Sequence, residues 1–159
     1  HPIDKYNIKV FGNQPWHINQ YCGFLQGEKL KDLFVSAKIC PNLSEPHAHH
    51  YGFDINERCF KILCAGGFCI SDNITSIAKI FSGNGVVFAD NPKDFREKVD
   101  YYLSHDEERR QIASQGQEFL LDTHTNFHRI ADILNYFGYE NEAAGILDNW
   151  AKTRRQLNA

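Results

Sequence analysis

The stretch ERCFKILCAGGFCIS (residues 57–71) joins a helical pattern to a buried strand through two adjacent glycines. Its first nine residues carry apolar side chains at helical spacing, which predicts a helix whose inward side chains are Phe60, Leu63 and Cys64. Gly66 and Gly67 are expected to end that helix. The apolar run at 68–71 then predicts a short buried strand. A helix that leads directly into a buried strand is typical of a βαβ unit.

The same alternation continues on both sides of this stretch. Further helices are predicted at 28–38 and 74–81, and further strands at 8–11, 39–43 and 86–88. Pro41 favours a strand end or an irregular ladder, because proline has no N–H to donate. The segment 44–56 is predicted to be a loop. The alternation indicates an α/β fold class, a Rossmann-like parallel sheet with helices on both faces.

The last third of the chain is predicted to be helical. Asn91, with Pro92 in the first turn and Asp94 after it, marks one helix start, and Ser104 with Glu107 forms a predicted capping box for the next. Two more helices are expected at 126–136 and 143–155.

Composition excludes several classes of function. The 159 residues are 42% hydrophobic, which fits one globular domain, and 17 basic against 20 acidic side chains give no field for binding nucleic acid. No apolar run is long enough for a transmembrane segment. Five cysteines without a CxxC pair favour reduced thiols and a cytoplasmic location over a zinc site. The absence of methionine suggests a part of a longer polypeptide.

Two loops are candidates for binding an anion at the carboxyl ends of the strands. One holds Gly12 and Asn13, and the other runs through residues 52–56 to a helix start, where backbone amides suit a diphosphate and Arg58 adds a forked donor. The alternative is that Asn56 only caps the helix and that Arg58 is a solvated surface side chain.

Histidines gather in the loop before this helix. Glu45, His47, His49 and His50 raise the possibility of a metal site, but a polar loop that lines a cleft is the better explanation, so no metal site is predicted. Glu45, His47 and His50 are the predicted cleft-lining set. His124 and His128 lie four residues apart without the carboxylate that a metalloprotease needs, so capping and packing are expected of them.

Two segments together resemble a known family, NERCFKILCAGGFCISDN (56–73) and the 85–134 region. They are similar to the C-terminal domain of glycosyltransferase group 1, in particular its CgeB-type spore-maturation branch. The specific parts are the Asn-x-Arg-x-Phe start at 56–60, the Ala-Gly-Gly turn at 65–67, the helix opening at 90–94, Glu108-Arg109, and the marks at 124–129.

The resemblance implies one half of a GT-B fold, in which two Rossmann-like domains face each other across a cleft. Residues 1–137 would be the donor-binding domain and residues 138–159 a C-terminal helical extension of it. The partner would be an N-terminal acceptor domain of the same polypeptide, absent here. The implied donor-binding residues are Gly12, Asn13, Gly52, Asn56, Arg58 and Lys61.

Lys61 departs from the family pattern, which has a glutamate at this position for the donor ribose. A lysine has no acceptor for a vicinal diol. It could contact phosphate, pair with Glu57 one turn earlier, or mark a domain that has lost catalysis.

The expected function is therefore binding of a nucleotide diphosphate sugar and support of glycosyl transfer to an unknown acceptor. The donor would be a substrate, and no metal or other cofactor would be required. Enzymatic activity is expected of the larger protein, with the isolated fragment inactive and the catalytic residues unassigned. The alternatives are a non-catalytic ligand-binding or protein-interaction domain of the same fold, and an unrelated doubly wound domain such as a flavodoxin-like regulator.

Overall fold

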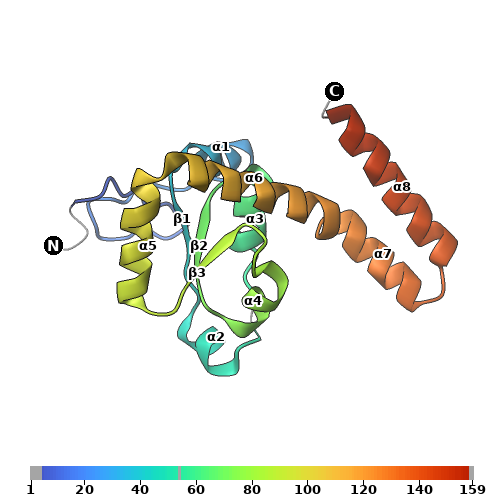
Figure 1. The fold of residues 1–159 in the computed structure, drawn as a ribbon, viewed down its shortest axis with the longest axis horizontal. Coiled ribbons are helices and arrows are strands. Elements are labelled where there is room, and N and C mark those ends of the chain that lie inside the picture. Colours follow the sequence, from blue (N-terminus) through green and yellow to red (C-terminus); the bar gives the residue numbers. More distant parts are fainter. Residues whose placement is uncertain (1–4, 54, 158–159) are drawn as a thin grey trace.

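The computed structural model describes residues 5–53 and 55–157, so Asp54 of the predicted 52–56 loop lies outside the described residues. Helices and strands alternate in the first two thirds (Figure 1), and helices alone follow. The elements are α1 (Glu28–Ser36), β1 (Cys40–Asn42), α2 (Pro46–Tyr51), α3 (Arg58–Ala65), β2 (Cys69–Asp72), α4 (Thr75–Phe81), β3 (Val86–Ala89), α5 (Pro92–Ser104), α6 (Asp106–Thr123), α7 (Asn126–Tyr136) and α8 (Glu140–Leu157).

The three strands form one parallel sheet in the order β1-β2-β3. Cys69 of β2 pairs with Cys40 on one side and with Val86 on the other. The chain passes from β1 to β2 through α2 and α3, and from β2 to β3 through α4. The predicted strands at 39–43, 68–71 and 86–88 are confirmed, and so is the Rossmann-like α/β fold class.

Helices cover both faces of the sheet, because successive strand residues point to opposite sides. One face packs under α3, α4 and the end of α6, with the core residues Cys40, Cys59, Ile62, Leu63, Cys69, Ile77, Phe81, Val86 and Leu120. The other packs against α5 and the middle of α6, with Phe68, Ile70, Ala89, Phe95, Val99, Ile112 and Ala113. Because the three strands are parallel, their carboxyl ends all lie at one edge of the sheet.

The predicted strand at 8–11 is wrong. This segment makes a single bridge between Val10 and Tyr21, in which Val10 N–H donates to Gln20 O and Cys22 N–H donates to Val10 O. The segment pairs with residues 20–22 of the loop that follows it and adds no strand to the sheet.

Four further predictions also need correction. The predicted loop at 44–56 contains α2, and Cys64 of α3 is exposed while Cys59 and Ile62 are buried. Ser104 does not cap α6, because its hydroxyl donates to backbone carbonyls of its own helix, α5. The last helix also begins three residues earlier than predicted.

A close contact between two glycines fixes α6 against the loop before β3. A Cβ on Gly85 would lie 2.0 Å from the Gly116 Cα, and one on Gly116 would lie 2.7 Å from Leu63 Cδ2. Gly85 also has a φ of 82°, which favours glycine. The turn before β3 and the middle of α6 therefore admit no side chain at these positions.

Helices α7 and α8 form a hairpin that extends from the end of α6 (Figure 1). Ala131 and Ala143 are buried in it, and Trp150 of α8 donates from Nε1 to Leu121 O of α6. Among the described residues, no helix combines the length and the apolar character needed to cross a membrane.

Candidate functional site

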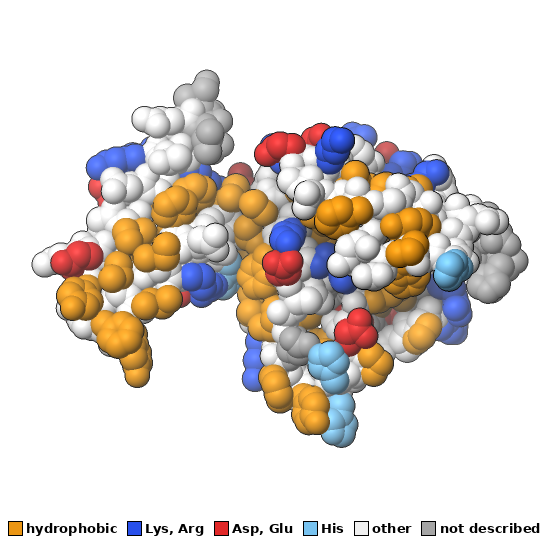
Figure 2. All heavy atoms as spheres, turned by 180° about the vertical axis from the view of Figure 1, so that it is seen from behind, with side chains coloured by type: hydrophobic (Ala, Val, Ile, Leu, Met, Phe, Trp, Pro, Cys, Tyr) orange, Lys and Arg blue, Asp and Glu red, His pale blue; other side chains and the backbone are white. Residues whose placement is uncertain are grey.

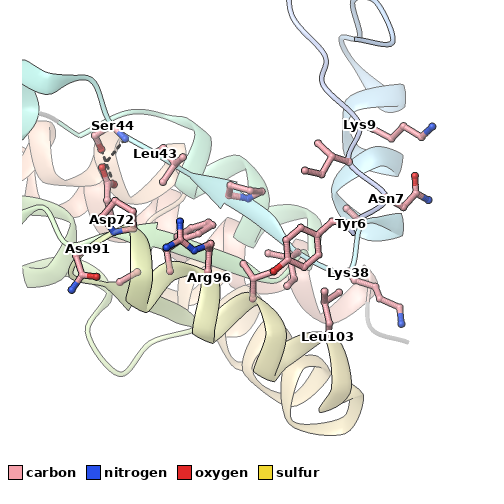
Figure 3. A pocket seen from close by; sticks show the side chains of 18 of the residues that line it. Tyr6, Asn7, Lys9, Lys38, Leu43, Ser44, Asp72, Asn91, Arg96 and Leu103 are labelled. Atoms are coloured by element: carbon pink, nitrogen blue, oxygen red, sulfur yellow. Dashed lines mark hydrogen bonds between the residues drawn. The ribbon is translucent and has the colours of Figure 1, made fainter. Parts of the chain in front are cut away.

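The carboxyl ends of the three strands carry polar side chains that lie at one edge of the sheet. Ser44 lies after β1, Asp72 ends β2 and is followed by Asn73, and Asp90 follows β3. They line one end of a cleft of about 1150 Å³ that opens beside β1 (Figure 3). In parallel sheets, ligands bind at this edge, because the loops there are free to turn toward them.

The walls of the cleft come from segments far apart in the sequence. The N-terminal residues 5–9 and the end of α1 form one wall, and α5 forms the other through Phe95, Arg96 and Val99. The floor includes Pro41 of β1. The cleft is thus apolar along β1 and polar at the carboxyl edge, a combination that suits a ligand with one apolar and one polar part.

Asp72 is the best-anchored polar group of the cleft. Its Oδ2 accepts from Ser44 N–H and from His49 Nε2, each at 2.8 Å, and its Oδ1 accepts from the Ser44 hydroxyl at 3.0 Å. The side chain is only 13% exposed. With the Ser71 hydroxyl, which donates to Oδ1 at 3.4 Å, four donors satisfy this carboxylate, so it holds α2 and the end of β1 in place.

His49 lines the cleft from the last turn of α2, and its side chain is 52% exposed. A carboxylate can only accept hydrogen bonds, so the ring nitrogen that faces Asp72, Nε2, carries the proton. The carboxylate thereby fixes the tautomer of the ring and leaves Nδ1 available.

The loop after β3 is held by the first turn of α5. Asn91 caps this helix by accepting from the Lys93 and Asp94 amides, as predicted, and Asp94 accepts from Asp90 N–H at 2.9 Å. The hydrogen bond from Lys98, followed by the one from the Asp90 backbone, lowers the pKa of Asp94. Asp90 itself accepts from Asn73 at 2.8 Å, which ties the ends of β2 and β3 together.

The predicted residues Asn56 and Arg58 lie at the start of α3. Arg58 is exposed and donates from Nη1 to Leu43 O at 3.2 Å, so it reaches the end of β1. Asn56 Oδ1 is buried and has no hydrogen-bond partner within the described chain, and the same holds for Asn42 Oδ1 at the end of β1.

Lys61 lies one turn further along α3 and pairs with Glu57, one of the three possibilities raised by the sequence. Gly52 ends α2 in a left-handed conformation, and its carbonyl accepts from the Ser76 amide and hydroxyl. The four predicted residues Gly52, Asn56, Arg58 and Lys61 thus lie on one loop and the helix after it, beside Leu43 and not among the residues that line the cleft.

Gly12 and Asn13 lie in a separate loop near the N-terminus. Gly12 N–H donates to Gly23 O, and Gly12 O accepts from the Tyr21 hydroxyl. Their predicted place in a donor cleft rested on a first strand that does not form, and their role stays a prediction.

Of the predicted set in the histidine-rich segment, Glu45 precedes α2, while His47 and His50 are exposed on it. His50 makes an edge contact with Tyr51. The member of this segment that lines the cleft is His49, which the predicted set omitted. No group of three or more histidine, cysteine, aspartate or glutamate side chains in residues 5–53 and 55–157 is placed to hold a metal ion.

Sequence reasoning also missed Arg96. It lies on α5, more than fifty residues from the end of β1, and no pattern in the sequence connects the two. Figure 3 shows its guanidinium in the cleft between α5 and β1.

Comparison with known proteins assigns the domain. A model of a family described as glycosyl transferase-like matches residues 1–135. These residues include the whole sheet, both walls of the cleft and nearly all of α7. No curated protein and no solved structure matches the chain significantly. The matched region covers most of the 159 residues, and the chain belongs to the glycosyl transferase-like family.

Proposed function

We propose that this domain binds a nucleotide diphosphate sugar at the carboxyl edge of its sheet and supports glycosyl transfer to an acceptor. The observation that carries the proposal is the cleft of about 1150 Å³, which ends on polar side chains at that edge in a glycosyl transferase-like domain. The apolar length of the cleft suits a nucleoside, and its polar end suits a sugar diphosphate. Assignment to the CgeB-type branch stays a prediction.

The start of α3 supports a contact with phosphate. No side chain among the described residues caps this helix, so its first amides are available to a ligand or to water. Arg58 uses Nη1 for Leu43 O and has further N–H groups to offer. In this proposal the amides and Arg58 stabilise the charge of the departing diphosphate, without a metal ion.

The direct test is a titration of the domain with UDP, GDP, ADP, CMP and their common sugar conjugates, followed by residue-resolved NMR. The proposal expects saturable shifts at residues 43–44, 52–61, 72–73 and 90–91. Shifts confined to other surfaces, or none with any of these nucleotides, would contradict it.

Replacement of Arg58 by alanine sharpens the same test. Loss of a charge-assisted contact to phosphate is expected to weaken binding of the best nucleotide about tenfold. The matched control is Arg110→Ala, since Arg110 is an exposed arginine on α6 whose side chain is 72% exposed. Equal affinity of the two variants would remove Arg58 from the site.

A second function, a non-catalytic binding domain, is favoured by one specific observation. Lys61 stands where the resembled family has a glutamate, and it is engaged with Glu57. Lys61→Glu distinguishes the two functions: tighter nucleoside binding would mean that the rest of a ribose site is intact. No gain, together with no transfer by the longer protein on any donor that binds, would favour the non-catalytic function.

Turnover is assigned to a two-domain arrangement in which another part of the polypeptide holds the acceptor. The isolated domain is then expected to bind the donor without transferring its sugar. Release of free sugar or transfer by residues 1–159 alone would contradict this division of roles.

A further inference from the structure

Two side chains that line the cleft, Arg96 and His49, differ from the predicted Arg58 in the hydrogen bonds that they make. Arg58 already donates to a backbone carbonyl, whereas no ion pair or hydrogen bond in the described part of the chain engages the Arg96 guanidinium. In Figure 3, Lys9 and Lys38 point away from the Asp72 end, while the head of Arg96 lies inside the cleft. An arginine without a carboxylate partner, beside an apolar wall, is suited to bind an anion.

His49 is the second of these side chains. Its Nε2–H donates to Asp72 at 2.8 Å, so the neutral ring offers Nδ1 only as an acceptor. If Nδ1 takes up a proton, the ring becomes a donor toward the cleft, and the adjacent carboxylate balances its charge. Ser44 holds that carboxylate through two hydrogen bonds of 2.8 and 3.0 Å, so the pair is fixed before any ligand arrives.

We propose that Arg96 and the Asp72-oriented His49 form the cleft-side contact for the diphosphate of the ligand, and that binding protonates His49. This inference rests on the proposed function and adds two residues to its site. Arg96 supplies a permanent forked donor, and His49 supplies a donor that forms only when an anion is present. The diphosphate is then held from two sides, by the start of α3 and by α2 on one face of the sheet and by α5 on the other.

The surrounding charges are compatible with proton uptake at this ring. The charged groups that line the cleft with His49 are Asp72 at the end of β2, Asp90 after β3, Arg96 on α5, Lys38 after α1, and Lys5 and Lys9 of the N-terminal segment. Glu45, His47 and His50 lie on its own helical segment. His50, the neighbouring histidine of the same helix, is therefore the matched control for His49.

The experiment measures affinity by calorimetry for UDP-glucose, GDP-mannose and inorganic pyrophosphate at pH 6, 7 and 8. The variants are Arg96→Gln and His49→Gln, and their matched controls are Lys93→Gln one turn earlier on α5 and His50→Gln next on α2. NMR spectra of each variant check that the fold is retained. Buffers of different ionisation enthalpy report the protons taken up.

The expected result is that Arg96→Gln and His49→Gln each weaken binding about tenfold at pH 6, while both controls bind like the parent. The parent is expected to lose about tenfold in affinity from pH 6 to pH 8 and to take up a proton at pH 7. His49→Gln should bind the nucleotide sugars without proton uptake and with a flat pH profile.

The outcomes separate this inference from the proposed function. If nucleotide sugars bind but the two variants match their controls, the inference fails and the proposed function stands. If only pyrophosphate binds, and both variants lose it, the inference stands and the nucleoside part of the proposed function fails. If no probe binds the parent protein, both are overturned.

Discussion

The body of the molecule, from α1 to α6, and the α7–α8 hairpin are held by different kinds of contact. The body encloses fully buried side chains such as Ile62 and Phe81 on one face of the sheet and Ile70 on the other. The hairpin buries small residues, Ala131 and Ala143, and leaves a large apolar face exposed. Figure 2 shows apolar side chains over the hairpin, which a hollow separates from the body.

This difference shows which part of the chain can support a binding site. The side chains that line the cleft must be held in place at the ends of β1, β2 and β3 and along α5. The buried core on both faces of the sheet fixes these elements. The hairpin exposes Phe127, Ile130, Ile133, Tyr136, Phe137 and Tyr139, and it contacts α6 through a few groups near Trp150. We therefore expect local opening of the hairpin to require less free energy than unfolding of the body.

The largest effect is expected from Gly85→Ala in the body. The new Cβ would lie 2.0 Å from the Gly116 Cα, and the positive φ adds strain, so the free energy of unfolding should fall by about 3–5 kcal/mol. Denaturant titration measures this loss. Gly83→Ala is the control, because Gly83 also has a positive φ but open space around its Cβ, and it should lose only about 1 kcal/mol. Equal losses would show that the glycine contact does not hold the body together.

A smaller, local effect is expected from Trp150→Phe in the hairpin. The change removes the 2.9 Å hydrogen bond from Nε1 to Leu121 O but keeps an aromatic ring to stack on Phe127. It should cost about 1 kcal/mol and speed amide exchange in α7 and α8, with no change in β1–β3. Trp16→Phe is the control, since Trp16 is 59% exposed. Faster exchange in the sheet would mean that hairpin and body open together.

The smallest effect concerns pH at the start of α7. His128 Nδ1 accepts from the Thr125 amide, and desolvation, followed by the charge of Arg129, lowers the pKa of this histidine. Because the folded pKa lies below that of the unfolded chain, stability is complete above the unfolded value of about 6.5 and falls as the pH drops toward the folded value.

Amide exchange in the first turn of α7 should therefore accelerate between pH 7 and pH 5. His128→Gln keeps an acceptor at this position of the capping box but cannot titrate, so its exchange should lose this pH dependence once corrected for intrinsic rates. An unchanged pH dependence in this variant would assign the effect to another group.

The sequence predicted the sheet and most helices because their signals are local. Strands β1, β2 and β3 are short apolar runs, and Asn91 with Pro92 marks α5 unambiguously. Helix α2 was missed because six residues with three histidines carry no helical period. What stabilises it is tertiary, namely burial of Ala48 and the bond from His49 to Asp72.

The candidate site was predictable only where its residues are close together in the sequence. The 52–61 segment was found through its position before a helix, and it does reach the end of β1 through Arg58. Arg96 and His49 could not be found in this way, because their relevance depends on how α5 and α2 lie beside β1. The strand predicted at 8–11 failed for a similar reason: an apolar extended run does not reveal which backbone it will pair with.

Pro41 has a consequence for how the protein behaves at high concentration. In the described part of the chain, β1 has a strand partner on one side only, and Cys40 N–H donates toward that side, to Phe68 O. Successive N–H groups along a strand alternate in direction, so the donor that proline lacks would have faced the open side. A strand of a second molecule at this edge could donate to the Pro41 carbonyl but would receive no hydrogen bond from Pro41. Stacking of sheets from molecule to molecule at this edge is thereby discouraged.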